Sequence, residues 1–176
     1  MTSDKHPRMW QEIVLFMAFG LYLIIFLVLL FCKASASQSI NLIPFHTISD
    51  YLSHGRPLGF SNIIGNIILL IPMGVYIALF SRPHTFWRTV LSVALISLSA
   101  EVLQYSMQVG AADIDDVILN TLGGMLGIAL HQGLHMVFRE KTRLAIGLIS
   151  LGAGILFVII TICLWIGVFG IRIRIM

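Results

Sequence analysis

Charged residues are scarce in this 176-residue chain: Asp, Glu, Lys and Arg together make up 11% of it. Apolar residues make up 58%, and the mean hydropathy is +0.96. A soluble globular domain carries roughly a quarter charged residues. The scarcity of charge therefore excludes an ordinary soluble domain and indicates a polytopic membrane protein, for which the bilayer is the solvent.

Cysteine is also scarce, and the two residues, Cys32 and Cys163, lie in or beside apolar runs without a His or Cys partner at metal-ligand spacing. We interpret both as small buried hydrophobic residues. The eleven basic residues are scattered between apolar segments, which is typical of membrane topology signals rather than of a surface that follows phosphates. No nucleic acid is expected as a partner.

Five apolar runs are long enough to cross a bilayer, which takes about 20 residues. They cover roughly residues 11–32, 62–80, 88–107, 117–138 and 144–169. Because they lack strand alternation, and because only helices or closed barrels satisfy backbone groups in lipid, the sequence predicts an all-α polytopic helical bundle. The connections are short, so residues 1–176 are expected to form a single membrane domain.

The first run resembles a signal peptide in its flanks, since Lys5 and Arg8 precede it and small residues at 34–36 follow it. Its apolar part is longer than the roughly 7 to 15 residues of such a peptide, so we expect an uncleaved helix.

The distribution of basic residues predicts a cytoplasmic N-terminus and an extracytoplasmic C-terminus. In that orientation seven basic residues are inside and four are outside. The inside set is Lys5, Arg8, Arg82, Arg88, Arg139, Lys141 and Arg143, and the outside set is Lys33, Arg56, Arg172 and Arg174. The segment 34–61 is then outside, and its apolar side chains favour a position along or in the outer interface, with a plain surface loop as the alternative.

Polar residues at membrane depth gather near the outer side. Four of the eight Asp and Glu residues lie between positions 101 and 127. Ser97, Glu101, Gln104 and Gln108 follow one another at intervals of four, three and four, which places them on one helix face. Glu101 stands roughly 9 Å below the outer end of its helix, so it is expected to face the bundle interior.

The fourth run begins with Asp113, Asp115 and Asp116, and Asn120 lies one turn below Asp116. Helix capping explains one or two of these aspartates. Asn62 and Asn66 share a face of the second run, where they act either as links between helices or as ligands. Gly123 and Gly127 form a GxxxG motif that favours close helix packing and permits an oligomer.

These polar groups predict one extracytoplasmic pocket, with Glu101 and Asp116 as candidates for acid or base catalysis. Carboxylate and amide oxygens suit a divalent cation, a cationic ligand, or hydrogen bonding to a sugar or lipid headgroup. His46 and Arg56, in the outer segment, are candidates to complete the site. The expected ligand residues are Asn62, Asn66, Glu101, Gln104, Asp113, Asp115, Asp116, Asn120, Arg56 and His46.

Four motifs in this order resemble the VanZ-like family: NLIPF at 41–45, NIIGNIILLIPMG at 62–74, ExxQ at 101–104 and DIDDVILNTLGGMLG at 113–127. The resemblance covers about residues 41–130. It implies a multi-pass protein of the bacterial plasma membrane, in a family named after a member associated with low-level resistance to the lipoglycopeptide teicoplanin. The matching positions are Asn62, Asn66, Pro72, Gly74, Glu101, Gln104, Asp113, Asp115, Asp116, Asn120 and Gly123.

One position departs from the family pattern, in which an Arg often precedes the Asp run, because Ala111 and Ala112 stand there in this chain. A carboxylate must then be balanced by Arg56, an ion, water or a ligand. Three functions stay open: a binding protein for an envelope lipid or a glycopeptide-like ligand, an enzyme acting on a lipid-linked envelope precursor, and a small transporter.

Overall fold

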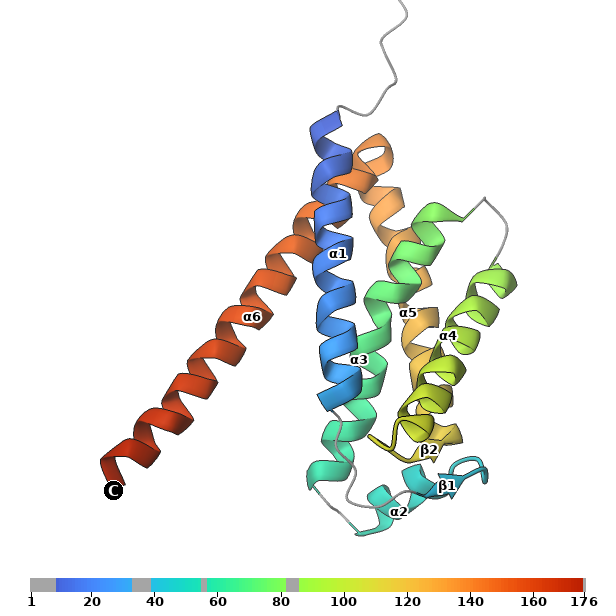
Figure 1. Ribbon diagram of the computed structural model, residues 1–176. Helices are drawn as coiled ribbons and strands as arrows, with labels where there is room; N and C mark the ends of the chain where they lie inside the picture. The colour runs from blue at the N-terminus through green and yellow to red at the C-terminus, as the bar shows by residue number, and fades with distance from the viewer. Residues whose placement is uncertain (1–8, 33–38, 55–56, 82–85, 176) are drawn as a thin grey trace, which may run out of the picture. The chain divides into compact units, whose positions relative to one another are not determined.

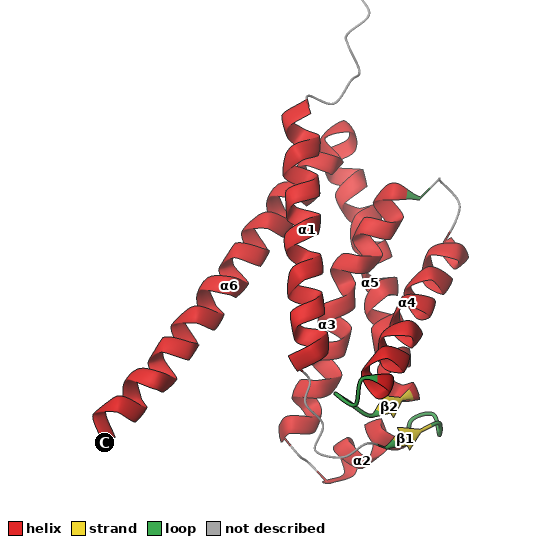
Figure 2. Ribbon diagram, in the orientation of Figure 1, coloured by secondary structure: helices red, strands yellow, loops and turns green. Residues whose placement is uncertain are grey.

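The computed structural model describes residues 9–32, 39–54, 57–81 and 86–175 (Figure 1). Its helices are α1 Met9–Cys32, α2 His46–His54, α3 Pro57–Phe80, α4 Phe86–Ser106, α5 Ile114–Phe138 and α6 Thr142–Ile175, with the short 3-10 helix η1 Arg139–Lys141 between the last two. The only strands in these ranges are β1 Ile40–Asn41 and β2 Ala112–Asp113, drawn in yellow among red helices (Figure 2). The prediction of an all-α membrane fold is confirmed.

Within the described ranges, four helical stretches are long and apolar enough to cross a membrane: Met9–Phe31, Phe60–Phe80, Phe86–Ser106 and Ile114–Ile166. The last of them runs through α5, η1 and α6. Helix α3 starts at Pro57, earlier than the predicted span at 62, because the fixed φ of proline suits the first turn of a helix. The count of five spans, the single domain and the orientation in the membrane stay predictions.

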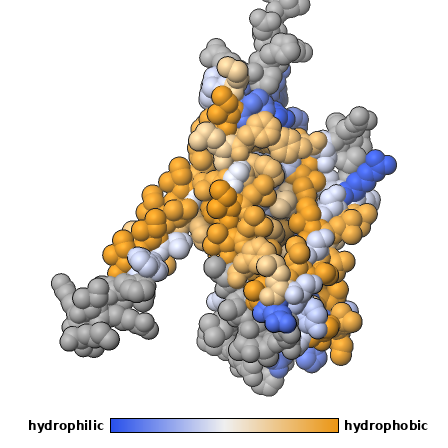
Figure 3. All heavy atoms as spheres, in the orientation of Figure 1, coloured by the Kyte–Doolittle hydropathy of each residue, from blue (hydrophilic) through white to orange (hydrophobic). Residues whose placement is uncertain are grey.

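Large apolar side chains are exposed on every long helix. Much of the face drawn in Figure 3 is accordingly orange. Examples are Phe16, Ile68, Leu95, Leu126 and Ile160. A bilayer rather than protein satisfies such side chains. Cys163 lies on this kind of surface and is exposed, so the prediction that it is buried was wrong. An apolar residue of a membrane helix needs lipid contact, not burial in protein. The side chain of Cys32 lies outside the described residues.

The chain divides into two compact units, of which the smaller combines the first part of α1, up to Ile25, with the chain from Glu140 onward. Leu15, Ala18 and Ile146 are buried in it. Arg143 donates two hydrogen bonds to the Glu12 carboxylate, each of 2.8 Å. In this bidentate pair each charged side chain has a partner of opposite charge, although both lie in apolar helices.

The larger unit, Phe26–Arg139, is built on the close packing of α3 against α5. A Cβ atom added to Gly123 would overlap the Ile67 carbonyl oxygen, and one added to Gly127 would overlap that of Ile71. The two backbones therefore approach as only glycine allows. The packing role predicted for the GxxxG motif is confirmed with α3 of the same chain as the partner. An oligomer through these glycines stays a prediction.

Candidate functional site

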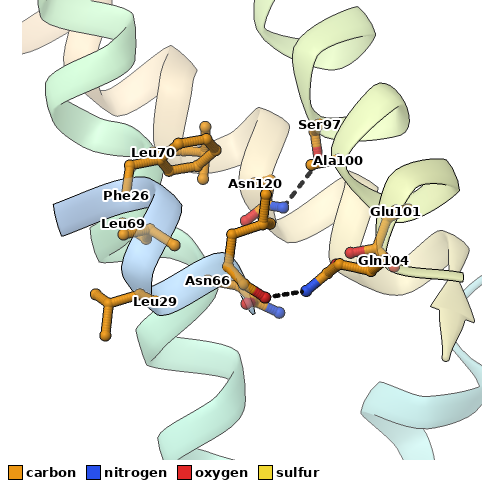
Figure 4. Close-up of a pocket in the computed structure, with 11 residues that line it drawn as sticks. Phe26, Leu29, Asn66, Leu69, Leu70, Ser97, Ala100, Glu101, Gln104 and Asn120 are labelled. Atoms are coloured by element: carbon orange, nitrogen blue, oxygen red, sulfur yellow. Dashed lines mark hydrogen bonds between the residues drawn. The ribbon is translucent and has the colours of Figure 1, made fainter. Parts of the chain in front are cut away.

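A small cavity of about 30 Å³ lies in the larger unit, between the end of α1 and helices α3, α4 and α5 (Figure 4). One part of its wall is polar and consists of Asn66, Ser97, Glu101, Gln104 and Asn120. The other part is apolar and consists of Phe26, Leu29, Leu30, Leu69, Leu70 and Ala100. Water needs a cavity of at least about 10 to 15 Å³, so there is space for about two waters or one small polar group.

Helix α4 supplies most of the polar wall, because Ser97, Glu101 and Gln104 recur at helical spacing and fall on one face. All three are buried, with exposed fractions of 1%, 5% and 2%. The prediction that Glu101 faces the interior is confirmed. Gln108 was predicted to continue this stripe and does not: α4 ends at Ser106, Gln108 has a positive φ of 58°, and its side chain is exposed.

The amide side chains of the wall use their nitrogen atoms on protein acceptors. Asn66 Nδ2 donates to Asp116 Oδ1, Gln104 Nε2 donates to the Leu30 carbonyl at 2.7 Å, and Asn120 Nδ2 donates to Ser97 Oγ at 2.8 Å. The last two are drawn as dashed lines in Figure 4. Asn120 Oδ1 is buried and has no hydrogen-bond partner among the described residues. One residue of the cavity wall therefore carries a buried acceptor without a partner among the described residues.

Asp115 serves a different purpose from the cavity residues. Its carboxylate accepts hydrogen bonds from three backbone N–H groups at the start of α2: Phe45 at 2.5 Å, Thr47 at 2.8 Å and Ile48 at 3.1 Å. The exposed fraction of Asp115 is only 1%. It acts as a capping anion for a helix that lies about 70 residues earlier in the chain.

Asp113 caps its own helix and also ties the strand β1 to it. Its side chain accepts from the Asp115 N–H, from Asn41 Nδ2 at 3.0 Å and from Thr47 Oγ at 2.6 Å. The parallel pairing of β1 with β2 places Asn41 opposite Asp113. The Asp113 N–H in turn donates to Glu101 at 3.2 Å. Asp113 and Asp115 thus hold β1 and the start of α2 in place and do not line the cavity.

Those of the remaining predicted residues that the structure describes do not line the cavity. Asp116 is buried and reaches it through Asn66. Asn62 is half-buried and is not part of the wall, and His46 is exposed at the first position of α2. Arg56 lies outside the described residues. The predicted pocket therefore draws together Asn66, Glu101, Gln104 and Asn120, and any binding or catalytic role of these residues stays a prediction.

Sequence reasoning missed two contributors to this region. Thr47 bonds Asp113 although no motif marks it, and the apolar wall comes partly from Phe26, Leu29 and Leu30 at the end of α1. An apolar residue in an apolar run carries no signal that it borders a cavity. The described residues hold no group of three or more His, Cys, Asp or Glu side chains placed to bind a metal ion.

Comparison with known proteins adds the family. A family model described as VanZ/LLP1 matches residues 19–139, which is more than half of the chain. The chain belongs to the VanZ/LLP1 family. Residues of the cavity wall from Phe26 to Asn120 all lie inside the matched range.

This chain is similar to Protein VanZ of Enterococcus faecium, with 32% identity over 111 residues. The match covers 62% of this chain and 63% of the relative, which is less than two thirds of the relative's length. No solved structure matches the chain.

Proposed function

We propose that this VanZ/LLP1 family chain is a multi-pass protein of the bacterial plasma membrane that lowers sensitivity to teicoplanin by binding an envelope lipid or a glycopeptide-like ligand without turnover. Family membership supports the link to resistance that the resemblance implies. Apolar helices long enough to span a bilayer support the membrane location.

One observation carries the binding role: a cavity that is polar on one side and apolar on the other, with a buried carboxyl group and a buried acceptor in its wall. Buried polar groups at membrane depth are costly unless they are paired, so a site of this kind is a functional candidate by default. The mixed lining suits the junction between the polar and apolar parts of a lipid. A cavity of about 30 Å³ accommodates one polar group of such a ligand and not a whole glycopeptide.

Glu101→Gln and Asp116→Asn test the binding role in living cells. Each variant removes a charge but keeps the shape, and we expect either change to return the teicoplanin sensitivity of an expressing bacterium to that of cells with an empty vector. The measurement is the minimal inhibitory concentration at matched membrane expression. Glu140→Gln is the control, because Glu140 lies exposed in η1. Full protection by both site variants would rule out the cavity as the working site.

A turnover assay separates this proposal from an enzyme acting on a lipid-linked envelope precursor. The purified protein is incubated with such lipids, with and without Mg²⁺, and the lipids are analysed by mass spectrometry. The binding role predicts unchanged lipids. Conversion that is lost in Glu101→Gln would replace the binding role with catalysis.

A further inference from the structure

The cavity wall has a surplus of hydrogen-bond acceptors. The side-chain nitrogens of Asn66, Gln104 and Asn120 each donate to an acceptor of the protein. Asn120 Oδ1 has no partner within the described part of the chain, and the exposed fraction of Asn120 is 7%. Leaving a buried acceptor unsatisfied costs about 1 to 3 kcal/mol, so a donor group in the cavity would recover that cost.

The ionisable side chains described at the cavity are acidic. Glu101 is part of the wall, and Asp116 lies behind Asn66, to which it is hydrogen-bonded. A hydrogen-bond donor that also carries positive charge is favoured beside carboxyl groups in a medium of low dielectric constant.

Size and lining narrow the class of donor further. The cavity of about 30 Å³ has space for one small polar group. A primary ammonium group has three N–H bonds to donate there, whereas a trimethylammonium group has none. Leu29 and Leu69 in the wall offer contact for a short alkyl arm. Leu29 is also 37% exposed, so the cavity borders the surface at the end of α1.

We propose that this cavity binds a primary ammonium group carried on a short alkyl arm, so that the envelope lipid it recognises is an aminolipid. This inference rests on the proposed binding function and specifies the ligand of the same site. The ammonium group donates to Asn120 Oδ1 and lies beside the Glu101 carboxyl group.

Lipid binding to the purified full-length chain tests the inference. Native mass spectrometry in detergent compares phosphatidylethanolamine with phosphatidylcholine of the same acyl chains. We expect phosphatidylethanolamine to bind at least about tenfold more tightly, which corresponds to one hydrogen bond to a charged group. Equal binding of the two lipids, as expected of a cavity that holds only water, would overturn the inference.

Two substitutions at one position show whether the acceptor is responsible. Asn120→Leu removes the acceptor and is expected to make the affinities for phosphatidylethanolamine and phosphatidylcholine nearly equal. Asn120→Asp keeps an oxygen there and is expected to retain the preference for phosphatidylethanolamine. Ser99→Ala is the control, because Ser99 is exposed on α4 and its hydroxyl donates to the Leu95 carbonyl of the same helix. Gel filtration and circular dichroism confirm that each variant is folded. A preference that persists in folded Asn120→Leu would contradict the inference.

Competition with free ethanolamine distinguishes a lipid from a soluble amine as the source of the ammonium group. Displacement of the lipid shows that the amine alone suffices, and an unchanged lipid preference assigns the site to the lipid. Teicoplanin sensitivity separates the two proposals. Loss of protection in Glu101→Gln without any lipid preference leaves the proposed function and removes this inference, and a lipid preference without protection does the opposite.

Discussion

At the scale of single residues, the carboxyl groups of Glu101, Asp115 and Asp116 accept hydrogen bonds from other segments of the chain. Asp115 accepts three backbone N–H groups of α2, Asp116 accepts from Asn66, and Glu101 accepts from the Asp113 backbone. An Arg before the Asp run, which the family pattern often has, is absent here. Backbone N–H groups and the Asn66 amide therefore donate hydrogen bonds to the carboxyl groups of the Asp run, where a basic side chain was expected.

Asp115→Ala should release α2, because three N–H groups lose a shared acceptor. Each hydrogen bond to a charged group contributes about 1.5 to 3 kcal/mol, and partial replacement by water leaves a net loss of about 2 kcal/mol. Amide hydrogen exchange of residues 47–54 should then become roughly 30-fold faster. The exchange rate in Asp115→Asn should fall between those of Asp115→Ala and the wild type. Unchanged exchange in Asp115→Ala would show that α2 is held by other contacts, and Glu140→Ala controls for loss of an exposed carboxylate.

At the scale of elements, the contact of α3 with α5 positions the cavity. Gly123 and Gly127 contact the carbonyl groups of Ile67 and Ile71, one turn apart on α3. The same contact brings Asn66 of α3 next to Asp116 of α5. Glycines in the packing surface therefore determine whether the polar groups of the two helices meet.

Gly127→Ala and Gly133→Ala, both on α5, form a matched pair for this contact. A methyl group at Gly127 overlaps the backbone of α3, and overpacking of this kind costs about 1 to 3 kcal/mol. A methyl group at Gly133 meets nothing within 4 Å and gains up to about 1 kcal/mol of helix propensity. Thermal unfolding in detergent, followed by circular dichroism, should show a lower midpoint for Gly127→Ala and an equal or higher one for Gly133→Ala. The reverse order would contradict the packing role.

At the scale of the whole molecule, the orientation in the membrane decides which side the cavity serves. Basic residues favour a cytoplasmic N-terminus by seven to four. The connection that carries β1 and α2 is then extracytoplasmic, together with the acidic start of α5. A ligand of the bacterial envelope would reach the site from that side.

Single cysteines test this orientation in a background in which Cys32 and Cys163 are replaced by alanine. Leu42→Cys, at an exposed position after β1, should react with a membrane-impermeant maleimide in intact cells. Ser81→Cys, directly after α3, should react only after the membrane is permeabilised. Labelling in the opposite pattern would show that the orientation is the reverse of the predicted one and that the cavity lies toward the cytoplasmic side.

Much of the candidate site could be predicted from local spacing. Glu101 and Gln104 share a helix face with Ser97, and Asn120 lies one turn after Asp116, so helix geometry alone indicates which side chains point the same way. The separation of Asp115 from the cavity could not be predicted. It depends on where α2 packs, and helical periodicity within a nine-residue segment does not indicate which distant helix its N-terminus will contact.

The sequence by itself determined that this is an all-α membrane protein, because its apolar runs exceed the thickness of a bilayer and only internally bonded helices satisfy their backbones there. Tertiary structure alone decided which polar groups share a cavity. Asn66 and Asp116 are 50 residues apart, and Thr47 and Asp113 are 66 apart, yet each pair is hydrogen-bonded. Those contacts depend on how closely whole helices approach, and the closeness is set by glycine backbones that meet only after the chain has folded.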